Sequence, residues 1–228
     1  AEISNGEIDG TMRQWYENGQ QKNEIEVSND ECNGAGKEWY ENGQQKNEAE
    51  YSNSEYNGNI KWWDEDGQQL LEAEVSKGDI VGSATVWYVD REKITADYKN
   101  NIIDGRYISW FANGQKHVEI DYIRDSRDTP YTNASLSPKK RQEILQDNLF
   151  QFLFITVRDI ANPSRFSYGS TGDYGNFQID KMFRSWYESG QIAHRVEFQN
   201  GKKHGTMESW FENGELKEEC TYHNGNLS

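Results

Sequence analysis

The sequence predicts an all-β fold, namely an elongated array of seven antiparallel β-hairpin repeats with a partly helical insertion. Three observations predict it. A tryptophan recurs about every 24 residues, an Asn-Gly dipeptide follows most of these tryptophans, and alternating polar and apolar residues come after each dipeptide. Self-similarity at a period of about 20–50 residues indicates a repeat array, in which each unit is stabilised by its neighbours.

The tryptophan period is nearly regular along the chain. The members of the series are Trp15, Trp39, Trp63, Trp87, Trp110, Trp186 and Trp210. The intervals between them are 24, 24, 24, 23, 76 and 24 residues. A glycine stands five residues before every member except Trp186, where Lys181 occupies that position. This regularity excludes a chance origin.

The residues of one repeat predict a β-hairpin. In the first repeat an aromatic-rich strand ends at Trp15, and Asn18-Gly19 follows it. Asn-Gly favours hairpins because both residues tolerate positive φ. The returning segment 22–27 alternates polar and apolar residues, as a half-buried strand does. Single hairpins are marginal in water, so we expect the stacking of repeats to provide the stability.

The repeat unit resembles the MORN repeat, in the longer variant found in many bacterial proteins. The resemblance rests on Asn5-Gly6-Glu7-Ile8-Asp9-Gly10, Trp39-Tyr40-Glu41-Asn42-Gly43 and Asn200-Gly201-Lys202-Lys203-His204-Gly205. It implies MORN-like repeats 1–5 at residues 5–122, an insertion at 123–181 and repeats 6–7 at 182–228. MORN-like proteins include scaffolds, lipid-associated proteins and, for this variant, antitoxin or immunity partners of bacterial toxins. The resemblance brings no catalytic residues.

The insertion, residues 123–181, has two interpretations. Ser137 is a candidate N-cap and Pro138 suits the first position of a helix. Apolar residues then follow helical spacing as far as Ile160, although residues 149–157 also fit a buried strand. Either the insertion covers an apolar face of the sheet, or it forms a recognition element displayed on a rigid scaffold.

The chain is strongly acidic and offers no combination of groups for catalysis. It carries 24 Lys and Arg against 39 Asp and Glu, a net charge of −15, which disfavours nucleic acid and membrane lipid as partners. The histidines and cysteines do not combine at metal-ligand spacing, and no nucleophile or phosphate-loop motif occurs. We therefore expect no enzyme activity, metal or cofactor. The compartment and the oligomeric state stay open.

Two sets of side chains are candidate binding residues. Acidic pairs share one side of each returning strand, and stacked repeats are expected to place them in rows of like charge. These rows are either a solvated face or a docking surface for a basic protein. The acidic candidates are Glu24, Glu26, Glu48, Glu50, Glu72 and Glu74. The aromatic residue after each tryptophan points to the other face and is a candidate interface anchor. These aromatic candidates are Tyr16, Tyr40, Tyr88 and Phe111.

The predicted function is a non-enzymatic, protein-binding repeat module. Its most concrete form is an antitoxin or immunity-type protein that neutralises a basic partner. The alternative is a structural or scaffold repeat protein of the cell envelope or of a self-assembling complex. The family resemblance, the acidic rows and the lack of catalytic groups support the first interpretation.

Overall fold

Strands and turns, without a helix, make up the part of the chain that the structure describes. This computed structural model describes residues 2–4, 7–88, 92–100, 102–124 and 177–228. The described residues fall into two compact units, those up to residue 86 and those from residue 87 onward. The predicted all-β class and β-hairpin array are confirmed. The segment expected to be helical, 138–160, lies outside the described residues.

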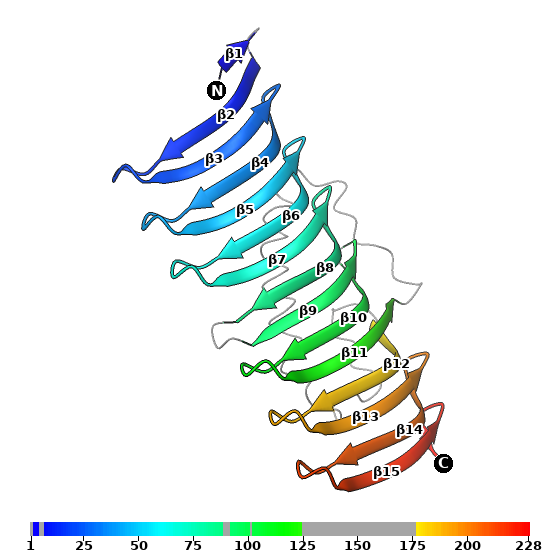
Figure 1. Cartoon of the computed structure of the whole chain (residues 1–228). Coiled ribbons are helices and arrows are strands. Elements are labelled where there is room, and N and C mark those ends of the chain that lie inside the picture. Colours follow the sequence, from blue (N-terminus) through cyan, green and yellow to red (C-terminus); the bar gives the residue numbers. More distant parts are fainter. Residues whose placement is uncertain (1, 5–6, 89–91, 101, 125–176) are drawn as a thin grey trace. The chain divides into compact units, whose positions relative to one another are not determined.

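The first unit is an antiparallel sheet whose strands follow the order of the chain (Figure 1). Its strands are β1 (Glu2–Ser4), β2 (Glu7–Trp15), β3 (Gln21–Ser28), β4 (Glu31–Trp39), β5 (Gln45–Ser52), β6 (Glu55–Trp63), β7 (Gln69–Ser76) and β8 (Asp79–Trp87). Equivalent positions of successive repeats lie in register. For example, Ile25 lies opposite Gly36, and Ala49 opposite Ile60.

The second unit is built in the same way. Its strands are β9 (Lys93–Lys99), β10 (Ile102–Trp110), β11 (Lys116–Arg124), β12 (Phe177–Trp186), β13 (Ile192–Gln199), β14 (Lys202–Trp210), β15 (Leu216–His223) and β16 (Asn226–Leu227). β11 pairs directly with β12, with Ile120 opposite Phe183. Residues 125–176 therefore interrupt the repeats in sequence but not in strand pairing. The domain limits at 122 and 182 stay a prediction, although strand structure runs to Arg124 and resumes at Phe177.

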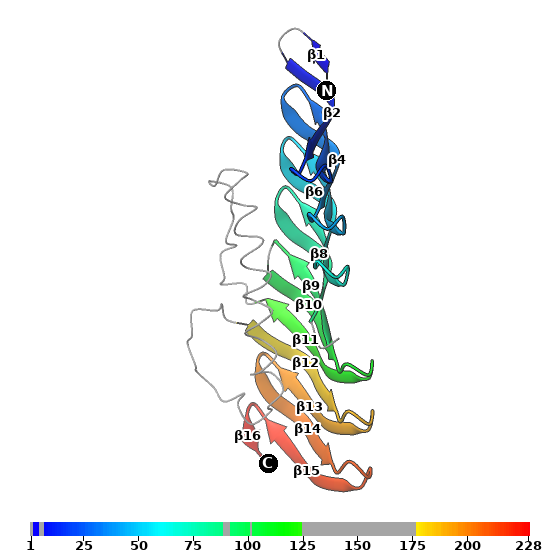
Figure 2. The same cartoon turned by 90° about the vertical axis from the view of Figure 1, so that its left-hand side faces the viewer.

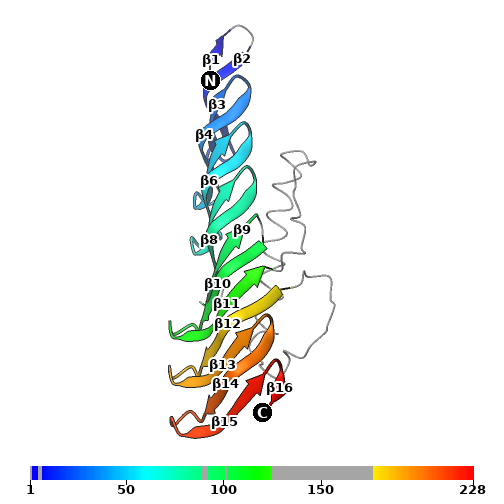
Figure 3. The same ribbon diagram turned by 90° about the vertical axis from the view of Figure 1, so that its right-hand side faces the viewer.

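Each unit is a single layer of strands, as the side views show (Figures 2 and 3). Two kinds of turn alternate along the chain, and each kind lies at its own edge of the sheet (Figure 1). At the turns that follow the tryptophans only the glycine has positive φ, as at Gly19 with φ +86°. The Gly19 N–H donates to the Tyr16 carbonyl at 3.0 Å, which gives a three-residue hairpin loop. At the other edge both turn residues have positive φ, as at Asn29 (φ 52°) and Asp30 (φ 62°), which form a two-residue turn.

A bulge lies at the recurrent glycine of the first strand in a repeat. Between β3 and β4 the register passes from Ile25–Gly36 to Val27–Cys32, so three residues of β4 lie opposite Glu26 alone. Gly34 in this bulge has φ +108°, and the carboxylate of Glu26 occupies the space that a Cβ would need. The same arrangement recurs at Gly58 with Glu50, Gly82 with Glu74, Gly105 with Asp97 and Gly205 with Glu197. Glycine is required for its backbone conformation and for its missing side chain.

The apolar face of each sheet carries the core. Its most buried residues in the first unit are Ile60, Leu71 and Ala73, each no more than 1% exposed. In the second unit they include Tyr107, Ile120 and Phe183, also no more than 1% exposed. The Tyr51 ring covers Gly36 of the neighbouring strand, where a side chain would collide with it. Met12 and Ile25 of the first repeat and Met207 and Cys220 of the last are only half-buried.

Lys181 holds the bulge position where the other repeats have glycine, and its φ is +79°. A left-handed conformation costs a non-glycine residue about 1–2 kcal/mol, whereas glycine adopts it freely but loses more entropy on folding. We expect Lys181→Gly to raise the free energy of unfolding by about 0.5–1 kcal/mol. The measurement is urea denaturation followed by tryptophan fluorescence. A lower midpoint would contradict the expectation.

A pair of substitutions in the first unit provides the control. Gly58 has φ +133°, and a Cβ there would lie 2.9 Å from the Glu50 Cβ, whereas a Cβ at Gly19 would meet nothing within 4 Å. Gly19→Ala therefore adds backbone strain alone, and Gly58→Ala adds strain and overlap. Gly58→Ala should lower the free energy of unfolding by more than Gly19→Ala, in the range of about 1–3 kcal/mol.

Candidate functional site

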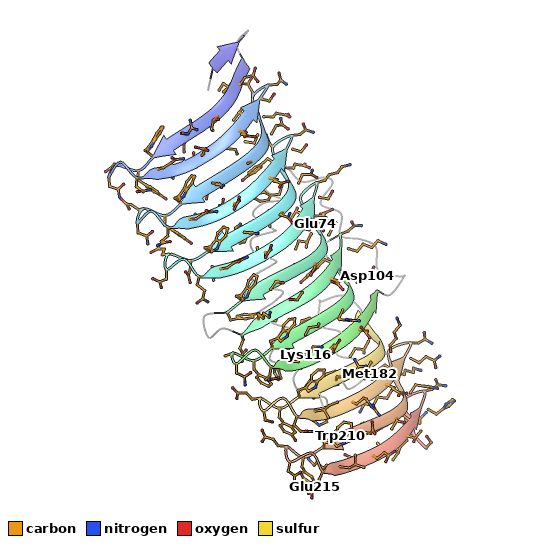
Figure 4. The ribbon with its side chains drawn as sticks, in the orientation of Figure 1. Glu74, Asp104, Lys116, Met182, Trp210 and Glu215 are labelled. Atoms are coloured by element: carbon orange, nitrogen blue, oxygen red, sulfur yellow. The ribbon has the colours of Figure 1, made fainter. Side chains whose placement is uncertain are left out.

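One side of the first sheet carries the apolar core residues such as Ile60 and Ala73. The other side is here named the polar face. Glu74 is one of its residues (Figure 4). Three rows of side chains cross its strands, because the repeats stack in register. They are the tryptophan row, the alternating row and the acidic row. Each repeats at every second strand, a spacing of about 9.6 Å from the separation of neighbouring strands.

The alternating row contains the first glutamate of each acidic pair and a basic residue from the strand beside it. Arg13 Nε lies 2.6 Å from Glu24 Oε2, Lys37 Nζ 3.5 Å from Glu48 Oε1, and Lys61 Nζ 3.4 Å from Glu72 Oε1. The hydrogen bond from Arg13 is the largest cause of a lowered pKa at Glu24. Glu24 and Glu48 also lie opposite Lys37 and Lys61 of the following strands. The expectation of like charges in a row is therefore wrong for these residues.

The acidic row contains the second glutamate of each pair, Glu26, Glu50 and Glu74, all exposed. Their cross-strand neighbours are Thr11, Ala35 and Asn59, and the bulge lies on the other side of each. Ala35 N–H donates to Glu26 Oε2 at 3.3 Å. Within the described residues, no lysine or arginine forms an ion pair with these three carboxylates. Here the expectation of like charges in a row holds.

The tryptophan row comprises Trp15, Trp39 and Trp63, which lie opposite Gln21, Gln45 and Gln69. Trp15 is 58% exposed and the other two are half-buried. No cation covers these three rings in the part of the chain that the structure describes. In the second unit, Lys93 Nζ lies 4.5 Å from the centre of the Trp110 ring, and Lys116 Nζ 5.5 Å from that of Trp186.

The aromatic candidates next to the tryptophans connect one repeat to the next. Tyr16 Oη donates to the Trp39 carbonyl at 2.8 Å, and Tyr40 Oη to the Trp63 carbonyl at 2.9 Å. Burial is the largest cause of a raised pKa at Tyr40. Phe111 lies against the His117 ring, with centres 4.3 Å apart, and Tyr88 is half-buried. The Asn-Gly turns add to these links, since the Asn42 amide donates to the Glu65 carbonyl at 2.8 Å.

The repeated hairpin, its glycine bulge and its links to the next repeat agree with a known family. A family model described as the MORN repeat variant matches residues 8–29, 33–53, 180–200 and 203–224. These four segments are MORN repeats of the variant type. No curated protein matches the chain. The matched residues belong to repeats one, two, six and seven, and the bulge glycines Gly58, Gly82 and Gly105 extend the same geometry through the repeats between them.

The negative charge of this protein is concentrated in its N-terminal repeats. Residues 1–86 carry 19 acidic and six basic side chains, a net charge of −13, which leaves −2 for residues 87–228. In the second unit Arg106 occupies the position of Ala35 and Asn59, and its Nε lies 3.5 Å from Asp121 Oδ1. Glu119 there faces Arg106, Lys116 and Arg184. The second unit therefore places a cation beside one carboxylate of the acidic-row position, Asp121, whereas the described residues of the first unit place none beside Glu26, Glu50 or Glu74.

The described residues offer little for catalysis. They contain no group of three His, Cys, Asp or Glu side chains placed to hold a metal ion. Cys32 and Cys220 are free thiols, and burial raises the pKa of Cys32. Burial also lowers the pKa values of His117 and His194. Within the described ranges there is no helix long and apolar enough to cross a bilayer. MORN repeats form a non-enzymatic repeat family.

Two sets of side chains in the site were not among the predicted binding residues. These are the tryptophans and the basic residues of the alternating row. A signal for the latter was present, because Arg13, Lys37 and Lys61 each stand two residues before a tryptophan. Period-two alternation puts them on the tryptophan side of the strand. Only the cross-strand register pairs them with the glutamates.

The hydroxyl of Tyr40 allows a test of its role in the array. Because Tyr40→Phe removes the hydrogen bond to the Trp63 carbonyl, we expect the free energy of unfolding to fall by about 0.5–1.5 kcal/mol. Tyr187→Phe should act likewise, since Tyr187 Oη donates to the Trp210 carbonyl at 2.9 Å. Urea denaturation measures both. Unchanged stability together with weaker partner binding would instead assign the hydroxyl to recognition.

Proposed function

We propose that this protein is a non-enzymatic, protein-binding module whose polar face in the first unit docks a basic protein. The acidic row carries the proposal. Glu26, Glu50 and Glu74 stand at a regular spacing, exposed, and without a counter-charge among their described neighbours. A partner that brings cations to this row gains attraction that the chain itself leaves unused.

The other two rows suit the same partner. The alternating row is already neutralised, so it adds little charge of either sign. The tryptophan row offers flat aromatic surface, and tryptophan is enriched among the residues that dominate binding energy at interfaces. Charge complementarity of this kind mainly raises the association rate and makes binding depend on salt. The acidic row thus attracts the partner, and the tryptophans hold it.

The most concrete form of the proposal is an antitoxin or immunity-type protein that occludes a basic surface of a toxin. The MORN repeats of the chain and the charge of −13 in residues 1–86 support it. Among the predicted binding residues we assign recognition to Glu26, Glu50 and Glu74. Tyr16 and Tyr40 already bond to backbone carbonyls of the next repeat. Glu24, Glu48 and Glu72 are ion-paired within the face.

A charge-neutralising variant tests the proposal. Ala35→Arg with Asn59→Arg copies Arg106 of the second unit and should neutralise Glu50 and Glu74 without unfolding the repeats. The immobilised chain should retain a basic protein from its native host at low salt and release it at high salt. The variant should retain much less of it.

The control for this experiment is Gln199→Arg with Thr221→Arg, which makes the same change in net charge at exposed positions of the second unit. It should bind like the unaltered chain. Recovery of no basic protein, or equal loss with both variants, would contradict the proposal.

The alternative, a scaffold that assembles through its repeats, has one observation in its favour. Three large apolar side chains near the C-terminal strands are exposed, with Phe211 at 48%, Leu216 at 51% and Leu227 at 67%. Nearly all residues of β15 are exposed as well. Light scattering after size-exclusion chromatography separates the two proposals. Concentration-dependent growth that Leu216→Lys abolishes would favour the scaffold, and a monomer at high concentration would exclude it.

A further inference from the structure

The three rows of the polar face have a common period that limits what can lie across them. Each repeat contains two strands, and neighbouring strands are about 4.8 Å apart. Equivalent side chains of successive repeats are therefore about 9.6 Å apart. The rows themselves are two residues apart along the strands, or about 6.6 Å. A ligand that contacts all three repeats must therefore present equivalent groups about every 9.6 Å, at right angles to the strands.

We propose that the occupant of this face is an extended basic segment of the partner, in the polyproline II conformation, with Arg or Lys at every third residue. This inference rests on the proposed function and specifies its ligand. A polyproline II helix has three residues per turn and rises about 3.1 Å per residue, so every third side chain lies on one edge about 9.3 Å from the last. That spacing matches the repeat.

The other regular conformations fit the three repeats less well. Side chains on one side of a β-strand recur at two residues, about 6.6 Å, and those three residues apart point to opposite sides. In an α-helix, a side chain on the same edge recurs after seven residues, or about 10.5 Å. This spacing exceeds that of the repeats by about 0.9 Å, and the mismatch accumulates at every repeat. The helix also places only one side chain in seven on that edge.

The arrangement of the rows assigns a role to each edge of the segment. When the segment lies above the alternating row, its basic edge faces Glu26, Glu50 and Glu74, and a second edge faces Trp15, Trp39 and Trp63. Prolines on that second edge fit aromatic surface, as in the recognition of proline-rich segments. The third edge remains in water. The segment gains two contacts per repeat and, being pre-extended, loses little conformational entropy on binding.

The second unit shows which groups these rows accept. Arg106 lies at the position of Ala35 and Asn59, and pairs with Asp121. Lys93 and Lys116 cover Trp110 and Trp186. In the described residues of the first unit, neither the acidic row nor the tryptophan row has such a group of its own. In the first unit, the acidic row can therefore accept cations from another chain, and the tryptophan row can accept its apolar surface.

The test uses the full chain and synthetic peptides. The first peptide is four repeats of Arg-Pro-Ala, and the second has the same composition with its arginines at irregular spacing. A third is a helical, alanine-rich peptide with arginine at every seventh position. Isothermal titration at about 50 mM salt measures each dissociation constant. We expect the first peptide to bind at least about tenfold more tightly than the others. Once one arginine is bound, each further arginine in step with a repeat binds as an intramolecular contact.

The variants locate the binding and separate this inference from the proposed function. Ala35→Arg with Asn59→Arg, and separately Trp39→Ala, should each weaken the first peptide about tenfold or more. Gln199→Arg with Thr221→Arg should not. Circular dichroism verifies that each variant keeps its strands. Equal affinity for all three peptides, or no binding of the first, overturns the inference. Capture of a folded basic protein through the same row would then still support the proposed function.

Discussion

The structure depends on one recurrent contact, in which a carboxylate of the returning strand lies over a glycine of the next repeat, as at Gly34, Gly58, Gly82, Gly105 and Gly205. Gly34 can take φ +108° and leave room for Glu26 only because it has no side chain. The bulge sets three residues opposite one, so the side-chain alternation on either side of it keeps its phase. The same face therefore stays apolar along every strand. The stack propagates because each repeat prepares this contact for its neighbour.

The bulge also separates the acidic pairs into two chemical environments. Glu24 lies in regular pairing and meets the basic residues two positions before the tryptophans, as at Arg13 and Lys37. Glu26 faces the bulge, where a side chain is excluded at Gly34, and so finds no cation. In the first unit, a structural requirement of the array thus leaves a row of exposed carboxylates, Glu26, Glu50 and Glu74. Unless another residue neutralises it, this row is available to a partner.

The two units differ in how they treat this row. The second unit places Arg106 beside Asp121 and gathers three cations around Glu119. The first unit has Ala35 and Asn59 at the equivalent positions and keeps nearly all of the net charge. The pairing of these strands is the same in both units, so the difference lies in exposed side chains beside the row. Positions that are free of structural demands are where a repeat protein can acquire specificity for a partner.

The sequence by itself determined the repeat, its period, the hairpin and the position of the missing glycine at Lys181. These features depend on local conformational preferences and on period-two alternation, which a single chain displays directly. Only the tertiary structure decided which charges meet. Arg13 and Glu24 are eleven residues apart, and the register of two strands, with a bulge that shifts it, brings them together. The same register decides that Tyr16 and Tyr40 bond to the next repeat, because their acceptors lie 23 residues away. Cross-strand register follows from the summed packing of many residues, and no local pattern specifies it.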